Sequence, residues 1–129
     1  MRDFTHETAE IAEGIPLKKG NDVYIGKGVQ IIGKGPIEIG DKTAIAWESI
    51  LISDNHDWKN NIDVTIEAPI KIGKHCWIGA RCIILGNSEI GDNCVVGAGS
   101  VVRGKFPSNC MILGNPAKIV KTGIGEKDV

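Results

Sequence analysis

Residues 66–102 read IEAPIKIGKHCWIGARCIILGNSEIGDNCVVGAGSVV, and one aliphatic side chain returns in this stretch at every sixth position. The series comprises Ile66, Ile72, Ile78, Ile84, Ile90, Val96 and Val102. A period of six excludes a helix face, whose apolar residues return every three or four positions. It predicts short strands joined by sharp corners, each strand pointing one aliphatic side chain inward.

The same rhythm runs through the N-terminal half of the chain. It passes through Ile25, Ile31 and Ile37, slips by two residues, and continues through Ile39, Ile45 and Leu51. One turn of such a chain cannot bury its own aliphatic face, so stability requires several coils stacked on one another. The rhythm then breaks, because Ile66 lies 15 positions after Leu51, which is not a multiple of six.

The composition supports an all-β protein. The 129 residues include 21 Ile and 9 Val but only 4 Leu, and β-branched side chains suit strands better than helices. A hydrophobic share of 42% with a net charge of -1 excludes a disordered chain and disfavours nucleic acid as the main ligand. No apolar run is long enough to span a bilayer, and the N-terminus lacks a signal-peptide profile. We therefore expect one domain, residues 1–129, in the cytoplasm.

The four cysteines are predicted to be structural thiols. Cys76, Cys82 and Cys94 each stand two residues before a repeating aliphatic position, and Cys110 does so if Ile112 continues the series. A small, slightly apolar side chain suits such a buried position. No C-x-x-C pair is present, which disfavours a zinc site.

His56 stands out among the three histidines. It lies in the polar segment of residues 53–61, where the aliphatic rhythm is broken, whereas His6 and His75 are expected to be solvated. Insertions in a solenoid often carry function. We therefore interpret His56 as a histidine at the mouth of a binding groove.

The six-residue period and its Ile-Gly and Val-Gly pairs resemble the hexapeptide-repeat family. This resemblance implies a left-handed parallel β-helix over residues 21–121, with an extended loop at 53–65. Residues 1–20 are then expected to form an N-terminal cap segment, and residues 122–129 a polar tail.

Two segments are similar to a narrower group, the galactoside, maltose and xenobiotic O-acetyltransferases. They are the histidine-bearing segment 52–57 and the run from Trp77 to Val102 followed by Gly114–Lys118. The resemblance implies transfer of an acetyl group from acetyl-CoA to a hydroxyl of a sugar or surface polysaccharide. It also implies a homotrimer with active sites between subunits, and no metal.

By this resemblance, His56 is the general base that deprotonates the hydroxyl and then returns the proton to the departing CoA thiolate. Histidine suits the role because its neutral imidazole is available near pH 7. Asp54, Asn55 and Asp57 are expected either to orient the ring or to bind acceptor hydroxyls.

The residues expected to bind CoA combine open backbone with positive charge. Glycine and alanine leave a narrow path for the pantetheine arm, and cations attract the phosphates. The predicted set is Trp77, Gly79, Ala80, Gly97, Ala98, Ser100, Arg103, Lys105, Lys118 and Lys121.

Two other functions are compatible with the repeats. One is a non-catalytic trimeric scaffold, which the repeats support equally well. The other is a γ-class carbonic anhydrase, which resemblance associates with a zinc ion held by three histidines. The sequence leaves the acceptor and the length of the acyl group open.

Overall fold

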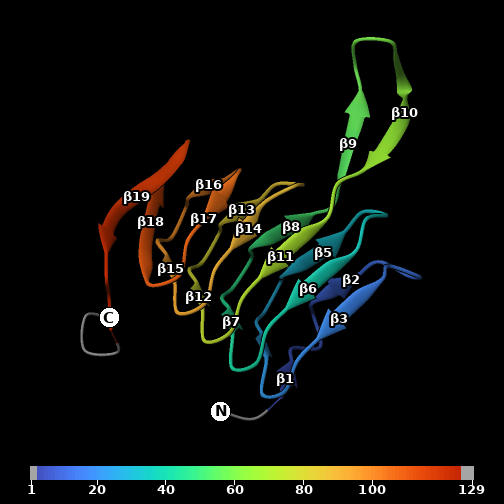
Figure 1. The fold of residues 1–129 in the computed structure, drawn as a ribbon. Coiled ribbons are helices and arrows are strands. Elements are labelled where there is room, and N and C mark those ends of the chain that lie inside the picture. The colour runs from blue at the N-terminus through green and yellow to red at the C-terminus, as the bar shows by residue number, and fades with distance from the viewer. Residues whose placement is uncertain (1–2, 126–129) are drawn as a thin grey trace.

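The computed structural model describes residues 3–125 as a left-handed parallel β-helix with three flat sides (Figure 1). We name the sides face A, face B and face C. Face A contains β1 (Phe4–Thr5), β4 (Tyr24–Ile25), β7 (Ala44–Ile45), β12 (Trp77–Ile78), β15 (Val95–Val96), β18 (Cys110–Gly114) and β19 (Ala117–Thr122). Its strands are parallel except β19, which folds back antiparallel on β18 and closes that end of the stack.

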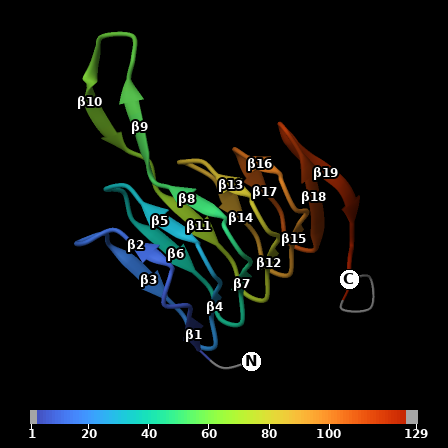
Figure 2. The ribbon, with the colours of Figure 1, turned by 180° about the vertical axis from the view of Figure 1, so that it is seen from behind.

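Faces B and C are five-stranded parallel sheets. Face B contains β2 (Glu10–Ile11), β5 (Gln30–Ile32), β8 (Ile50–Ile52), β13 (Ile83–Ile84) and β16 (Val101–Val102). Face C contains β3 (Leu17–Lys19), β6 (Ile37–Ile39), β11 (Ile70–Ile72), β14 (Glu89–Ile90) and β17 (Lys105–Phe106). A hairpin of β9 (Asp54–Asp57) and β10 (Asn61–Glu67) projects from the corner between faces B and C (Figures 1 and 2).

The predicted aliphatic ladders form the core. Ile78, for example, pairs in register with Ile45 on one side and Val96 on the other, and all three side chains are buried. The prediction for Ile66 is wrong, because this residue lies on the hairpin with 48% of its surface exposed. The core position that the period assigns to it, in register with Ile84 on face B, is occupied by Leu51.

The two-residue slip in the rhythm has a structural cause. The two extra residues lie in the turn between β5 and β6, because Ile31 and Ile39 are eight positions apart, whereas Ile84 and Ile90, at the matching places on faces B and C, are six apart. The coils in this half are correspondingly longer: Ile25 pairs with Ile45, 20 positions on, whereas Ile78 pairs with Val96, 18 positions on.

The two ends of the chain are more regular than predicted. Residues 4–19, expected as a cap, form a full coil whose three strands pair with β4, β5 and β6. In the predicted polar tail, Ile124 is buried and its N–H donates to the carbonyl oxygen of Asn109 at 3.0 Å. Residues 1–2 and 126–129 lie outside the described part of the chain.

The prediction of structural thiols is confirmed. All four cysteines are buried and form no disulfide. The thiols of Cys76, Cys82 and Cys94 donate to carbonyl oxygens 13 to 15 positions further along the chain, as Cys76 does to Gly91 at 3.0 Å, and Cys110 donates to the nearby Ser108. A hydrogen bond with Cys94, together with burial, raises the pKa of the Cys76 thiol. Burial raises the pKa of Cys82.

No helix within residues 3–125 is long and apolar enough to cross a membrane.

Candidate active site

The hairpin that carries His56 replaces the loop expected from the sequence. His56 pairs with Thr65, Asn55 with Ile66 and Asp54 with Glu67, with one irregularity between Asn61 and Thr65. Residues 61–67 alternate polar and apolar side chains, which is a pattern typical of a β-strand. That alternation was the available signal for β10.

The base of the hairpin is fixed to the coil stack by backbone contacts. The N–H of Ala68 donates to the carbonyl oxygen of Ser53 at 2.8 Å, and the N–H of Gly35 donates to the same oxygen at 3.2 Å. A Cβ atom at Gly35 would lie 2.6 Å from that oxygen, so the approach requires glycine. The hairpin therefore leaves the rigid corner in a defined direction.

A backbone carbonyl orients the His56 ring. Nδ1 lies 2.8 Å from the carbonyl oxygen of Ile62. A carbonyl oxygen only accepts, so Nδ1 carries the proton and donates. In the neutral ring, Nε2 is then the unprotonated nitrogen, able to accept a proton from a substrate. The side chain is exposed, which leaves Nε2 open to a ligand or a second subunit.

The three polar neighbours predicted around His56 lie on the same strand. Asp54 accepts the backbone N–H of Lys34 at 2.6 Å, and Asp57 accepts the side-chain amide of Asn60 at 3.1 Å. Asn55 is half-buried and pairs with Ile66. The contact that orients the ring comes from the Ile62 carbonyl, which the sequence did not reveal.

Most of the residues predicted to bind CoA lie at one edge of the prism. Trp77 points outward from face A with 48% of its surface exposed. The corner between faces A and B is formed by segments 79–82 and 97–100, which contain Gly79, Ala80, Gly97, Ala98 and Ser100. Lys118 and Lys121 are exposed on β19, at the end of face A.

Gly79 and Ser100 also have structural roles at this edge. A Cβ atom at Gly79 would lie 2.7 Å from the amide nitrogen of Ala98, so glycine is required for the coils to pack. The Ser100 hydroxyl donates to the carbonyl oxygen of Gly97 at 2.7 Å and accepts the N–H of Gly114 at 3.0 Å.

Arg103 and Lys105 are separated from that edge. Arg103 is exposed in the turn between β16 and β17, at the corner of faces B and C. Lys105 points outward from face C and forms an ion pair with Glu89 at 3.2 Å.

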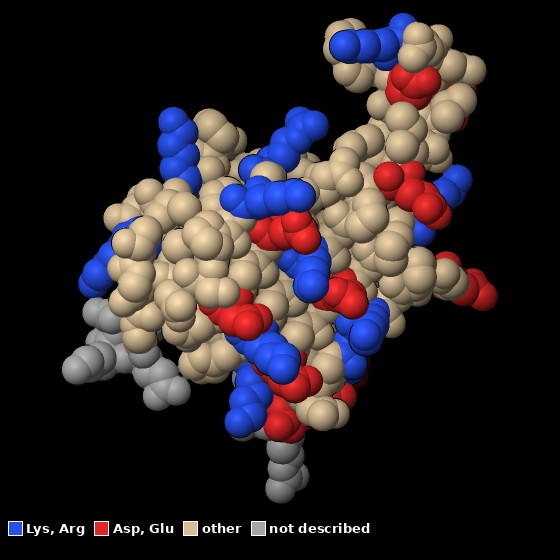
Figure 3. All heavy atoms as spheres, viewed as in Figure 1, with Lys and Arg blue, Asp and Glu red and all other residues tan. Residues whose placement is uncertain are grey.

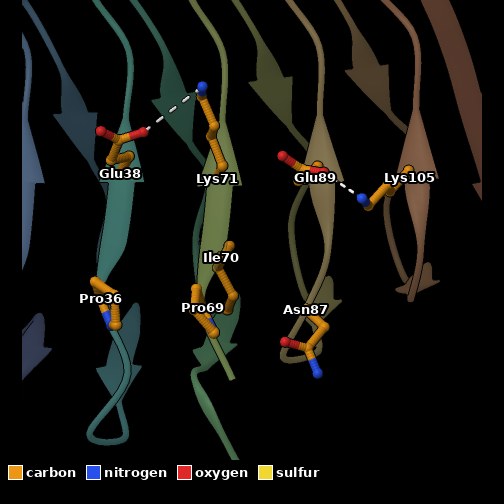
Figure 4. A pocket seen from close by; sticks show the side chains of 8 residues that line it. All are labelled: Pro36, Glu38, Pro69, Ile70, Lys71, Asn87, Glu89 and Lys105. Atoms are coloured by element: carbon orange, nitrogen blue, oxygen red, sulfur yellow. Dashed lines mark ion pairs between the residues drawn. The ribbon is translucent and has the colours of Figure 1, made fainter. Parts of the chain in front are cut away.

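Face C carries alternating charges. The outward residue at the same register of each strand is Lys18, Glu38, Lys71, Glu89 and Lys105 in turn. Figure 3 shows the resulting mixture of blue and red side chains. A groove of about 600 Å³ is lined by Glu38, Lys71, Glu89 and Lys105 of this row and extends to Pro36, Pro69 and Asn87, near the base of the hairpin. Within it, Lys71 reaches toward Glu38 and Lys105 toward Glu89 (Figure 4). His56 does not line this groove.

Comparison with known proteins agrees with the repeat architecture. Residues 69–104 match the family model described as bacterial transferase hexapeptide (six repeats). The chain is a hexapeptide-repeat protein. It is 32% identical over 105 residues to WcaF of Escherichia coli, and the match covers 81% of this chain and 58% of WcaF. WcaF is provisionally assigned as a colanic acid biosynthesis acetyltransferase.

Two solved structures share nearly the whole fold. The hexapeptide-repeat acetyltransferase VCA0836 of Vibrio cholerae superposes with a TM-score of 0.87 at 27% identity, covering 94% of this chain and 70% of its own. A galactoside acetyltransferase in complex with coenzyme A gives a TM-score of 0.89 at 25% identity, covering 98% and 64%. The chain thus spans less than two thirds of the length of WcaF and of that galactoside enzyme.

Among residues 3–125, no three His, Cys, Asp or Glu side chains are grouped so that they could hold a metal ion.

Proposed function

We propose that this protein is an acetyl-CoA-dependent O-acetyltransferase acting on a hydroxyl of a sugar or surface-polysaccharide acceptor. The single observation that carries the proposal is the His56 ring, whose Nδ1 is bonded to the Ile62 carbonyl while the ring remains exposed. The similarity to a galactoside acetyltransferase crystallised with coenzyme A supports the donor and the acceptor class.

In the proposed reaction, Nε2 of His56 takes the proton of the acceptor hydroxyl as its oxygen attacks the thioester carbonyl carbon. The C–S bond then breaks, and the CoA thiolate takes the proton back from the imidazolium. The Ile62 carbonyl stabilises that imidazolium by continuing to accept from Nδ1–H. No covalent enzyme intermediate is needed, because the thioester is already activated.

For CoA we propose the edge between faces A and B. Trp77 would flank the cofactor, and the segments containing Gly79, Ala80, Gly97, Ala98 and Ser100 would border the pantetheine arm. Lys118 and Lys121 would meet the phosphates. Arg103 and Lys105 lie elsewhere on the same chain, so any contribution from them requires CoA bound to a neighbouring subunit.

We further propose a homotrimer, because the hairpin and the CoA edge of one chain lie at different corners of the prism. A neighbouring copy would bring its own CoA edge to His56. The outward positions of faces A and B are largely apolar, with Trp77, Val95, Ile50 and Ile83 among them, whereas face C is charged. A partner copy would therefore pack best against faces A and B. It could also cover the exposed apolar hairpin residues Trp58 and Ile62.

The test is His56→Ala, assayed by thiol release from acetyl-CoA with a panel of sugar acceptors. Loss of a general base predicts a kcat lower by at least about 10²-fold, with CoA affinity unchanged in calorimetric titration. His75→Ala is the matched control, since His75 is also exposed and its Nδ1 is also hydrogen-bonded, to Asn93 at 3.0 Å. Near-full activity of His56→Ala contradicts the assigned role.

The titration also separates the enzyme from a non-catalytic scaffold. A folded protein that shows no detectable CoA binding favours the scaffold, because binding of the donor is required for transfer but not for assembly.

A further inference from the structure

Lys34 lies on the same face of the hairpin as His56. It belongs to the turn between β5 and β6, at the corner from which the hairpin projects. Its Nζ donates to the Thr65 hydroxyl at 3.2 Å. Thr65 is directly opposite His56 in the β9–β10 pair, and directly opposed residues point their side chains to the same face. The Lys34 ammonium and the His56 imidazole therefore lie on the same face of the hairpin.

The backbone holds Lys34 in this position. Its N–H donates to the Asp54 carboxylate at 2.6 Å, and Asp54 is two residues before His56 on β9. The preceding residue, Gly33, has a φ of 118°, and an added Cβ atom would lie 2.5 Å from the Ser53 hydroxyl. The turn that presents Lys34 is therefore built against the base of the hairpin.

The charge of Lys34 is not neutralised by an ion pair within residues 3–125. Lys18, Lys19, Lys71, Arg81 and Lys105 each lie within 4.0 Å of a carboxylate oxygen, whereas Lys34 is bonded only to a neutral hydroxyl through its side chain. Asp54 and Glu67 are paired with each other on the two strands of the hairpin, and among the described residues neither forms an ion pair with the Lys34 ammonium. The ammonium has three donors, and Thr65 takes one of them.

We infer that Lys34 binds an anionic group of the acceptor, so that the substrate is an acidic sugar. This inference rests on the proposed function, since it places the anion beside the hydroxyl that His56 deprotonates. His56 and Thr65 are directly opposed, and the Cβ atoms of such a pair are about 5 Å apart. Because the Lys34 ammonium is bonded to Thr65, a ligand that reaches both His56 and Lys34 spans about one sugar ring. A carboxylate or a phosphate on that ring would accept the two remaining donors in charge-assisted hydrogen bonds.

Lys34→Met tests the inference with matched pairs of acceptors. The probes are methyl glycosides of glucuronic and galacturonic acid, the corresponding neutral glucosides and galactosides, and glucose 6-phosphate. We expect the wild type to prefer at least one anionic probe, and Lys34→Met to lower kcat/KM for that probe by about tenfold or more. Its kcat/KM for neutral probes should stay within about twofold. A preference for uronides over glucose 6-phosphate identifies the anion as a carboxylate, and the reverse identifies a phosphate.

The control is Lys59→Met, which removes a lysine from the hairpin tip and is expected to leave the preference unchanged. An equal loss for anionic and neutral probes in Lys34→Met, or a wild type that prefers neutral probes, overturns the inference.

A binding measurement separates this inference from the proposed function. The ring resonances of His56 in histidine-labelled protein are followed by NMR during titration with the same probes, without acetyl-CoA. Tighter binding of an anionic probe in the wild type, lost in Lys34→Met, supports the anion site even if His56→Ala remains active. Equal binding of anionic and neutral probes by the wild type contradicts it, whatever the turnover.

Discussion

The ring of His56 is oriented by the carbonyl oxygen of Ile62, a group that every residue type possesses. Its position depends on the hairpin register, including the irregularity between Asn61 and Thr65. The sequence singled out His56, because the break in the aliphatic rhythm surrounds it. It did not reveal the partner, since no side-chain pattern marks a backbone acceptor.

Lys34 was missed for a related reason. Its side chain contacts Thr65, 31 positions away, and its N–H contacts Asp54, 20 positions away. Both contacts depend on how the hairpin leaves the coil stack, which a six-residue rhythm does not encode. The cysteines were predictable because each occupies a fixed place in that rhythm.

The buried thiols are predicted to be unreactive in the folded protein. At pH 8, Ellman's reagent should label none of the four cysteines rapidly, because burial excludes the reagent from all of them. Burial also raises the pKa of Cys82, and the hydrogen bond with Cys94 together with burial raises that of Cys76. The same hydrogen bond lowers the pKa of Cys94 to about 7, so for this thiol the protection comes from burial alone. In denaturant all four should react. Rapid labelling of the native protein would show that the ladder opens or that the thiols lie outside it.

At the scale of elements, the hairpin is an addition to the prism rather than part of its core. Its large side chains Trp58, Ile62, Val64 and Ile66 are exposed, and Ala68 rejoins the stack beside Ser53. The sequence predicted an excursion at this place but not its strands, because its polar residues indicate a loop and the alternation in β10 is short.

Replacing residues 54–67 by Gly-Gly should therefore leave the prism folded. The existing hydrogen bond from Ala68 N–H to Ser53 C=O would then close a four-residue β-turn. We expect a β-rich circular dichroism spectrum like that of the wild type and loss of acetyl transfer by at least about 10²-fold, as for loss of His56. An unfolded product would show that the hairpin supports the core, and retained transfer would place the active site elsewhere.

At the scale of the molecule, stability depends on the stacked aliphatic ladders. Ile78 is fully buried between Ile45 and Val96, so Ile78→Ala removes several methyl groups from three coils at once. The free energy of unfolding should fall by about 2–5 kcal/mol, measured by urea denaturation. Val120→Ala, at an exposed aliphatic position, should change it by less than about 0.5 kcal/mol. Equal effects would contradict the ladder as the source of stability.

The rhythm predicted the fold over most of the chain, because each buried aliphatic position repeats. It placed the start of the repeats too late, since the first coil carries Thr5 and Ile11 at positions that are less buried than their partners Ile25 and Ile31. How copies of the chain meet cannot be read from one sequence, because that depends on whole faces of the prism.

The central claim is that acetyl transfer occurs at His56, with CoA bound along the edge of a neighbouring copy. A crystal structure of the protein with CoA tests it most directly. We predict three copies around one axis, with the CoA sulfur within about 3 Å of the His56 Nε2 of an adjacent copy, or one water away. A CoA sulfur bound far from every His56 in the assembly would contradict the claim.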